Sequence, residues 1–336
     1  MKRVLITGGT GFVGANLTAA LLERGHDVRI LRRQTSDLRA LAGLEVPYAI
    51  GDVRDPGSLK AAVRSCDMVV HTAAIVKFWK ARWTEQFSVN VEGTRNVVNA
   101  CLSEGVTRLV HLSSIAALGH PQGKGTADEN TPYNWVEGPS YKYSKRLAEL
   151  EVLEGIRKGL NAVIVNPSVI IGERDIHFHG GSLLTNVKKG TTIFYIDGGM
   201  NVVYVGDVVK GIILAAEKGR TGERYILGGA NMTTREVFAR TAELIGGRAP
   251  IARAPLPILR GFTRAVEAVY GLAGKEPPIT MDLMVHAGIY NWYSSDKAVR
   301  ELGYTITPFD ETILAAYRWY REHGHFGKNG AKTTYK

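Results

Sequence analysis

Hydrophobic residues in the first half of the chain fall into short runs that alternate with longer segments of helical periodicity. Apolar runs that end at turn residues predict buried strands, and such runs occupy residues 3–7, 27–32, 47–50, 68–71, 108–113 and 162–166. Helical spacing lies between most of them, at residues 58–65, 84–104 and 141–158. Strands that are buried on both faces and joined by helices predict an α/β fold with a doubly wound parallel sheet.

The pattern becomes less regular after Pro167. A strand is predicted at 201–205, a helix at 206–218, and a further strand at 223–227 that would return to the sheet. Residues 232–286 are predicted to be mostly helical, with breaks at several prolines. We therefore expect a first domain over 1–172, to which 200–230 return, a smaller and mostly helical lobe from 173–199 and 231–325, and a disordered basic tail at 326–336.

The segment 258–273 is amphipathic, with apolar residues at helical spacing and Arg260 and Arg264 among them. Such a helix can pack on its own domain, rest on a membrane surface or cover an apolar substrate. Packing on the parent domain is the commonest arrangement, so we expect it here.

Composition places the chain among globular proteins. Its 336 residues suit two domains of ordinary size or one large domain with a smaller lobe, and 45% of them are hydrophobic and 22% charged. No apolar run approaches the ~20 residues of a membrane span, and the N-terminus leads straight into a predicted strand. These features predict a cytoplasmic protein without a membrane span, and leave only weak peripheral association open. Cys66 and Cys101 have neither metal nor disulfide spacing and are expected to be core thiols.

The net charge of +10 changes this picture little. Basic residues are dispersed along the chain rather than clustered, which argues against nucleic-acid binding. A basic surface attracts an anionic cofactor or substrate. We expect a small-molecule partner, with the chain itself a homodimer or a monomer.

A glycine-rich turn follows the first predicted strand and precedes a segment of helical spacing at 15–24. A dinucleotide pyrophosphate requires this order: one glycine permits the tight turn, another lets the backbone approach the phosphates, and a third lets the helix pack on the strand. The N-terminus of the helix then offers unpaired N–H groups to the anion. The motif has two frames, starting at Gly9 or at Gly8 and containing Gly11 and Gly14 in both. It predicts a nucleotide-binding site.

Two Tyr-x-x-x-Lys pairs occur in the chain, Tyr141 with Lys145 and Tyr293 with Lys297. On a helix the two side chains of such a pair share a face. A nearby ammonium lowers the pKa of tyrosine from about 10 and makes the phenol a usable acid or base at neutral pH. Tyr141 opens a helix that follows a strand of the sheet, whereas Tyr293 lies beyond the nucleotide-binding half, where Asp296 would cap a short helix. We expect Tyr141 to be catalytic and Tyr293 to be structural.

Further motifs accompany the glycine turn and the Tyr141/Lys145 pair. They are Gly51-Asp52-Val53, His71-Thr72-Ala73-Ala74, Asn90-Val91-Glu92-Gly93-Thr94, Leu112-Ser113-Ser114 and Asn166-Pro167-Ser168. From the first strand to about residue 323, the chain resembles an extended short-chain dehydrogenase/reductase of the NAD-dependent epimerase/dehydratase superfamily. The resemblance implies a Rossmann-type sheet, a nicotinamide cofactor and a mostly helical C-terminal lobe that binds the substrate.

The resemblance also implies roles for individual residues. Tyr141 would exchange a proton with the substrate oxygen, while Lys145 would bind the nicotinamide ribose and lower the pKa of Tyr141. Ser114 would hydrogen-bond the reacting carbonyl, and Ser113 is the less favoured choice for this role. Asn90 matches an asparagine that supports the active-site helix, although an asparagine at a helix start would also explain it.

Cofactor contacts are implied at the glycine turn, at the ends of several strands and in the active-site helix. The implied residues are Gly8, Thr10, Gly11, Phe12, Val13, Arg32, Arg33, Asp52, Val53, Thr72, Ala73, Ala74, Tyr141, Lys145, Pro167 and Ser168. Within this set Asp52 and Val53 would contact the adenine. Arg32 and Arg33 end the second strand, and no acid follows them before Asp37. Because arginine suits a 2′-phosphate whereas an acid suits the free 2′-hydroxyl of NAD, the sequence favours NADP(H) over NAD(H).

The family includes carbonyl reductases, hydroxysteroid-type dehydrogenases, nucleotide-sugar epimerases and sugar dehydratases. A 4,6-dehydratase usually has Asp-Glu after the active-site hydroxyl residue, but Ile115 and Ala116 stand here and neither can move a proton. Residues 166–172 look more like dihydroflavonol reductases than like nucleotide-sugar epimerases, and they also resemble a bacterial subgroup named hopanoid-associated sugar epimerases.

We therefore expect an NADP(H)-dependent oxidoreductase that reduces a ketone or aldehyde of a medium-sized, partly apolar substrate. A sugar epimerase that retains its NAD(P) is the alternative, and a non-catalytic NADP-binding sensor is a third hypothesis. The intact set of Ser114, Tyr141 and Lys145 argues against the sensor.

Two segments are candidates for the substrate side of the site. Val76, Phe78 and Trp79 follow the loop implied to border the nicotinamide, and their aromatic rings would stack on the substrate or pack against the protein surface. His177 and His179 follow the sixth strand and are expected to flank the substrate. Because no third ligand lies nearby in the sequence, no metal is expected there.

Overall fold

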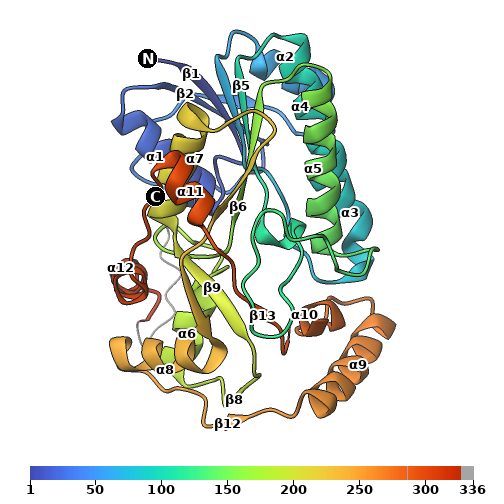
Figure 1. Cartoon of the computed structure of the whole chain (residues 1–336), viewed down its shortest axis with the longest axis vertical. Coiled ribbons are helices and arrows are strands. Elements are labelled where there is room, and N and C mark those ends of the chain that lie inside the picture. Colours follow the sequence, from blue (N-terminus) through green and yellow to red (C-terminus); the bar gives the residue numbers. More distant parts are fainter. Residues whose placement is uncertain (286, 327–336) are drawn as a thin grey trace.

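A seven-stranded parallel sheet forms the centre of the computed structural model, which describes residues 1–285 and 287–326 (Figure 1). Its strands lie in the order β3-β2-β1-β4-β5-β6-β10. Each strand predicted in the first half is present within one residue of its predicted ends, and the strand predicted at 223–227 pairs with β6 as expected. The strands are β1 (Arg3–Thr7), β2 (Asp27–Arg32), β3 (Tyr48–Ile50), β4 (Met68–His71), β5 (Arg108–Leu112), β6 (Ala162–Pro167) and β10 (Arg224–Leu227).

Helices cover both faces of this sheet because its central strands are apolar on both sides. Val4 and Ile6 of β1 face one core, whereas Leu5 faces the other. The predicted doubly wound α/β fold is thus confirmed. The helices of the first core are α1 (Phe12–Glu23), α7 (Val205–Lys218) and α11 (Asp296–Leu302), and those of the second are α2 (Pro56–Val63), α4 (Gly93–Ser103) and α5 (Tyr141–Arg157).

The order of the strands reverses between β1 and β4. From β1 the chain continues to β2 and β3 on one side, whereas β5 and β6 lie on the other side of β4. In open α/β sheets, ligands bind beyond the carboxyl ends of the strands at such a point. The glycine turn follows β1 and Thr72 follows β4, so both lie at this crevice.

The long helix predicted at 84–104 contains a π-helical turn. It consists of α3 (Trp83–Phe87), the π turn Ser88–Glu92 and α4. The turn contains Asn90, whose side chain accepts a hydrogen bond from the N–H of Ile75 and donates one to its C=O, both at 2.9 Å. Asn90 therefore lies inside a helix and does not start one.

A second, four-stranded sheet is formed by β7 (Val169–Ile171), β9 (Gly199–Tyr204), β11 (Ala230–Thr233) and β13 (Tyr290–Asn291). The strand predicted at 201–205 is present, but it belongs to this sheet and not to the parallel one. A third hydrophobic core joins the second sheet to its helices. These are α6 (Gly181–Lys189), α8 (Thr234–Ile245) and α12 (Phe309–Glu322).

The end of the molecule opposite the N-terminus is built from a two-stranded sheet and a pair of helices (Figure 1). They are β8 (Phe194–Tyr195), β12 (Ala252–Arg253), α9 (Leu256–Leu272) and α10 (Met281–Val285). The expectation that α9 packs on its own domain holds for one side only, because Thr263 is its fully buried residue. Short 3₁₀ turns occupy Arg39–Leu41, Lys80–Arg82 and Ile115–Ala117.

Several smaller expectations are settled by the structure. Asp296 is the first residue of α11 and does not cap it: Ser295 holds the cap position, and its side chain makes no capping hydrogen bond. Cys66 and Cys101 are buried free thiols, as predicted. The tail predicted to be disordered lies outside the described residues, apart from Phe326. Within the described ranges, every helix is too short or too polar to cross a bilayer.

Candidate functional site

The glycine turn is shaped by close backbone contacts. Gly8 has a φ of +74°, and a Cβ there would lie 2.6 Å from the backbone nitrogen of Ala73. A Cβ on Gly14 would lie 2.2 Å from the carbonyl oxygen of Gly8, which also accepts the N–H of Gly11 at 2.9 Å. Gly9 is equally restricted, because its Cβ would meet the side chain of Ile30. Only glycine fits these positions.

The resulting cradle fits the pyrophosphate of a dinucleotide. Helix α1 begins with Gly11 at its cap position, and no side chain of the described residues caps it, so the N–H groups of its first residues are left for an anion. Thr10, Phe12 and Val13 lie in this turn. On the opposite wall, Thr72 donates its hydroxyl to the Thr7 carbonyl at 2.7 Å and leads into Ala73 and Ala74.

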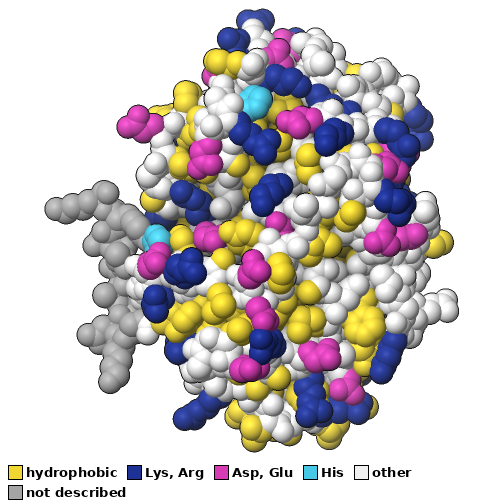
Figure 2. All heavy atoms as spheres, turned by 60° about the vertical axis from the view of Figure 1, so that its left-hand side comes forward, with side chains coloured by type: hydrophobic (Ala, Val, Ile, Leu, Met, Phe, Trp, Pro, Cys, Tyr) yellow, Lys and Arg dark blue, Asp and Glu magenta, His cyan; other side chains and the backbone are white. Residues whose placement is uncertain are grey.

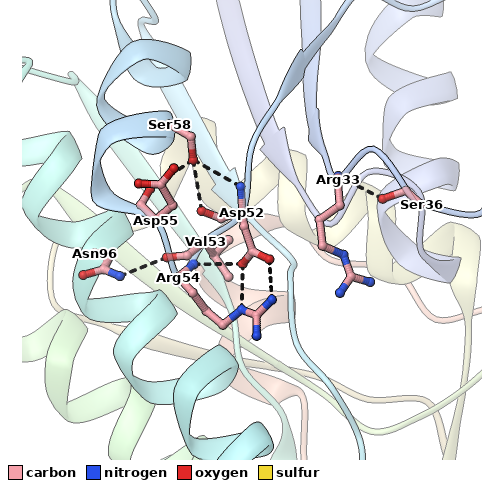
Figure 3. Close-up of polar contacts among 8 residues, drawn as sticks. All are labelled: Arg33, Ser36, Asp52, Val53, Arg54, Asp55, Ser58 and Asn96. Carbon is pink, nitrogen blue, oxygen red and sulfur yellow. Dashed lines mark hydrogen bonds and ion pairs between the residues drawn. The ribbon is translucent and has the colours of Figure 1, made fainter.

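The two arginines at the end of β2 have different surroundings. The Arg32 guanidinium lies 3.8 Å from the centre of the Tyr48 ring. Arg33 is exposed, and its hydrogen bonds are made by its backbone: its N–H donates to Ser36 Oγ at 3.0 Å, and its carbonyl accepts from the N–H of Ser36 at 3.1 Å. Within the described part of the chain its guanidinium has no hydrogen-bond or ion-pair partner, and it projects freely in Figure 3. Arg33 is therefore the arginine available to a ligand.

Asp52 is already paired in this structure. Arg54 donates to its carboxylate from Nε at 3.0 Å and from a terminal nitrogen at 2.7 Å, as Figure 3 shows. These hydrogen bonds hold the pKa of Asp52 below its usual range against the opposing effect of burial. Val53 is buried, and its carbonyl accepts from Asn96 at 3.0 Å.

Ser114, and not Ser113, lies against Tyr141. A side-chain hydrogen bond with Ser114 lowers the pKa of Tyr141, but burial of the phenol outweighs it and raises that pKa to about 12. Ser114 Oγ also accepts the Ala116 N–H at 3.1 Å. The Ser113 hydroxyl is buried without a partner among the described residues.

Lys145 lies one helical turn beyond Tyr141 and is almost fully buried. Its ammonium donates to the Leu112 carbonyl at 2.8 Å, and burial lowers its pKa to about 8, opposed by the charge of Glu149. The resemblance implies that Lys145 lowers the pKa of Tyr141, but this structure shows no such lowering. Here the ammonium is held by a backbone oxygen, and desolvation of the phenol dominates.

A chain of hydrogen bonds connects β1 to the active-site helix. His71 contacts Thr7 at 2.6 Å and Thr94 at 3.0 Å, and Thr94 donates to the carbonyl of Asn90 at 2.6 Å. The Asn90 side chain then donates to Ser144 of α5 at 3.0 Å. Burial lowers the pKa of His71 to about 3, so its ring is neutral. Asn90 thus supports the active-site helix, as the resemblance implied.

Aromatic side chains stand beside Tyr141. The Phe78 ring meets the Tyr141 ring edge-on, with centroids 5.9 Å apart, and Trp83 stacks on Tyr143 at 6.3 Å. Phe78, Trp79 and Trp83 line a small hollow next to this group. Val76 is 40% exposed. A second hollow, between α1 and α7, contains none of the predicted site residues.

A family model described as the NAD dependent epimerase/dehydratase family matches residues 4–228. The chain belongs to this family. A putative dihydroflavonol 4-reductase of Synechocystis is 35% identical, covering 95% of this chain and 95% of its own length. Sterol demethylase protein B of Methylococcus capsulatus is 33% identical, covering 95% of this chain and 98% of its own length. The crystal structure of gox2253 superposes with a TM-score of 0.85 at 38% identity, covering 96% of this chain and 99% of that one.

As a member of the epimerase/dehydratase family, the chain is an NAD(P)-dependent enzyme with a Rossmann-type sheet. Dehydrogenases and reductases as well as epimerases are among its relatives, so membership fixes the cofactor class and leaves the reaction to be argued from the site.

Sequence reasoning missed a buried ionic group behind the site of this epimerase/dehydratase-family enzyme. Glu149 is fully buried, bonds Arg224 at 2.8 Å and accepts from Asn166 at 2.6 Å. Asn166 also donates to the carbonyl of Ser114 at 2.9 Å. One signal was present, because Glu149 follows Lys145 by one turn and so shares its helix face. Its partner Arg224, far along the chain, could not be paired with it from the sequence.

Sequence reasoning also missed two charged residues near Tyr141, Asp282 and Lys142. Asp282 of α10 accepts the backbone N–H of Tyr141, and burial raises the Asp282 pKa. Lys142 is buried with its ammonium 3.9 Å from the centre of the Trp135 ring, and burial lowers its pKa to about 8. The interactions of Asp282 connect α10 to the first turn of α5.

Four predicted site residues remain: Pro167 and Ser168 at the end of β6, and His177 and His179 further along the chain. Pro167 ends β6, and the Ser168 hydroxyl beyond it is buried without a partner among the described residues, a polar group free for a ligand. His177 and His179 lie with their rings 6.0 Å apart, and His177 is near enough to Asp37 to lower its pKa. Within the described ranges, neither histidine makes a hydrogen bond or a ring contact with Tyr141 or Phe78, and those ranges hold no cluster of three metal-ligating side chains.

Proposed function

We propose that this enzyme is an NADP(H)-dependent oxidoreductase that reduces a ketone or aldehyde of a medium-sized, partly apolar substrate. One observation carries the proposal. The Ser114 hydroxyl lies close enough to the Tyr141 phenol to lower its pKa, aromatic side chains stand beside this pair, and Lys145 lies one turn away. A carbonyl oxygen placed at this pair would meet two hydroxyl donors.

The cofactor, when bound, supplies the hydride that the carbonyl carbon accepts. Tyr141 transfers its phenolic proton to the carbonyl oxygen: the O–H bond of the phenol breaks, and that of the product alcohol forms. Ser114 donates a hydrogen bond to the same oxygen as charge develops on it. Lys145 supplies positive charge one turn away, which favours the phenolate that remains.

The substrate class rests on the walls of the site and on the relatives. Phe78, Trp79 and Trp83 offer ring surfaces to an apolar skeleton. Two relatives at 33% and 35% identity over nearly their whole length are named for sterol and dihydroflavonol chemistry. Both names denote fused, largely apolar ring systems, which supports a ring ketone as the first substrate to test.

The choice of NADP(H) rests on Arg33. Its free guanidinium lies at the end of β2, where this fold binds the ribose 2′ position of a dinucleotide, whereas the Arg32 guanidinium packs on the Tyr48 ring and leaves its Nε without a hydrogen-bond partner among the described residues. A charge-assisted contact to a phosphate is worth about 1.5–3 kcal/mol, or roughly ten- to a hundredfold in affinity.

Titration of the purified protein with NADPH and NADH, followed by reduction of a panel of steroid ketones, dihydroflavonols and simple aldehydes, tests the proposal. We expect NADPH to bind at least about tenfold more tightly than NADH, and Arg33→Gln to remove most of that preference. Arg300→Gln, at an exposed arginine on α11, is the matched control. Equal affinity for both cofactors would overturn the NADP assignment, and no oxidation of NADPH with any carbonyl would overturn the reductase.

A retained-cofactor epimerase is the second candidate, because a solved structure described as a nucleoside-diphosphate-sugar epimerase is similar at 28% identity and a TM-score of 0.80. An epimerase would purify with tightly bound cofactor and interconvert nucleotide sugars without consuming NADPH. A non-catalytic sensor would bind NADP and show neither activity.

A further inference from the structure

Helix α9 has an apolar face that the described residues of the protein do not cover. Thr263 is buried, and Leu259 and Val266 are half-buried. On another side of the helix, Phe262 is 60% and Leu272 is 92% exposed. An ordinary surface helix would present polar side chains there.

The exposed apolar residues of α9 form a continuous line. Ile258, Phe262, Ala265, Val269 and Leu272 are separated by four, three, four and three residues, which places them along one side of the helix. All five are exposed. Scattered exposed hydrophobic residues need no explanation, but an ordered row of them does.

The two-stranded sheet that precedes α9 in the chain also has exposed apolar side chains. Ile251 and Ile193 are exposed and joined by a backbone hydrogen bond of 3.0 Å, and exposed Phe194 pairs with β12. Figure 1 shows β8, β12 and α9 along the same end of the molecule, and Figure 2 shows hydrophobic and basic side chains together at that end. We call this surface the apolar rim: Ile193, Phe194, Ile251, Ile258, Phe262, Ala265, Val269 and Leu272.

In the described part of the chain, the acidic side chains on and near α9 have partners, whereas two of its arginines do not. Glu267 is turned to the protein, where it accepts the Met281 N–H at 2.9 Å. Glu276 is paired with Lys77 at 3.3 Å. By contrast, Arg260 and Arg264 are exposed and have no carboxylate partner within the described residues. Arg260 and Arg264 each lie two residues from members of the row and so project from a different side of α9, which carries unpaired positive charge.

We propose that the apolar rim docks this enzyme on the surface of an anionic lipid bilayer. An exposed apolar row on one side of α9 and unpaired arginines on another match the acyl boundary and the acidic headgroups of such a surface. A second copy of the chain fits less well, since each copy has a net charge of +10 and brings the same unpaired arginines. This proposal concerns binding to a lipid surface, so it does not depend on which reaction the enzyme catalyses.

Docking would also orient the site. Glu276, just beyond α9, pairs with Lys77, and Lys77 directly precedes Phe78. The loop that contacts Tyr141 is thereby tied to the element placed on the lipid. A bilayer-dissolved substrate would reach the site from this side.

Co-sedimentation of the full chain with vesicles tests the proposal. Vesicles of phosphatidylcholine and phosphatidylserine in a 7:3 ratio are compared with pure phosphatidylcholine at low and high salt. We expect binding to the anionic vesicles that weakens with salt. Ile258→Gln with Phe262→Gln should reduce partitioning at least about tenfold, and Arg260→Gln with Arg264→Gln should reduce it by about tenfold.

The matched control is Val299→Gln with Arg300→Gln, an exposed apolar and basic pair on α11, which should leave partitioning within about twofold. All variants keep the lysines of residues 327–336, so attraction through that segment would survive in them. Unchanged thermal melting would show that the variants fold. Absence of binding to anionic vesicles would overturn the proposal, as would binding that ignores Ile258 and Phe262. A dimer in light scattering that the Ile258/Phe262 variant converts to monomer would instead make the rim a self-association surface.

Discussion

The two Tyr-x-x-x-Lys pairs have the same spacing and opposite surroundings. Tyr141 and Lys145 lie on one helix at the carboxyl end of the parallel sheet, where Tyr141 meets Ser114 and an aromatic wall. Tyr293 precedes α11, is buried, and donates its hydroxyl to the Gly119 carbonyl at 3.0 Å. Lys297 bonds Glu223 at 2.5 Å. Spacing alone is therefore uninformative, because the partners of each side chain decide its role.

The largest difference should appear on removing the two phenol hydroxyls. Tyr141→Phe removes the proton donor and should lower turnover of any ketone that the wild type reduces by about 10³-fold. Tyr293→Phe removes one buried hydrogen bond and should cost about 1 kcal/mol of folding free energy with turnover nearly unchanged. Steady-state kinetics and thermal melting of both variants measure this. Equal losses of turnover would end the distinction between the pairs.

Replacing the two lysines comes next. Lys145→Met should lower turnover by about 10²-fold, because the phenolate loses its nearby positive charge. Lys297→Met breaks an ion pair whose carboxylate is 38% exposed, and should change stability by less than about 1 kcal/mol. Kinetics on the same ketone, with Lys145→Arg to separate charge from shape, checks both. A fully active Lys145→Met enzyme would contradict the proposed role of Lys145.

Removing the carboxylate near each lysine should destabilise the fold to different degrees. Glu149→Gln leaves Arg224 without its anion behind the site, and because the Arg224 side chain is only 22% exposed, we expect a loss of about 2 kcal/mol. Glu223→Gln should cost below about 1 kcal/mol. Urea unfolding of both variants measures the two losses. A larger loss for Glu223→Gln than for Glu149→Gln would contradict a stabilising role of the buried ionic group behind α5.

The smallest effect is a pH dependence of cofactor binding. Lys145 has a pKa of about 8, so it is charged below that pH and loses its charge as the pH rises through it. Affinity for anionic NADPH should therefore be highest below pH 8 and fall by up to about tenfold per pH unit above it. Fluorescence titrations between pH 6.5 and 9.5 measure the slope. Lys145→Arg should flatten it, and a flat wild-type profile would disagree with a charged Lys145 contact.

Local signals made the nucleotide-binding half predictable. Its strands are continuous apolar runs between turn residues, and Gly8 and Gly14 mark backbone approaches that exclude any side chain. Position in the chain separated Tyr141, which opens a helix after a strand of the sheet, from Tyr293, whereas spacing alone could not.

Long-range partners explain what the sequence did not reveal. Arg224 meets Glu149 only because β10 returns to the edge of the parallel sheet, and Asp282 reaches the N–H of Tyr141 from another lobe. The bond between Lys145 and the Leu112 carbonyl is likewise set by packing between α5 and β5. The exposure of α9 could not be predicted either, since its apolar pattern is that of a packed helix.

Single-turnover transfer of deuterium from NADPH labelled at the nicotinamide C4 position tests the central claim most directly. A ketone reduced by the wild type is mixed with enzyme and labelled cofactor, and the alcohol is analysed by mass spectrometry. We predict one deuterium in the product from the wild type and from Tyr293→Phe, and almost none from Tyr141→Phe within the same time. Labelled product from Tyr141→Phe at the wild-type rate would contradict the assignment of Tyr141 as the acid of this site.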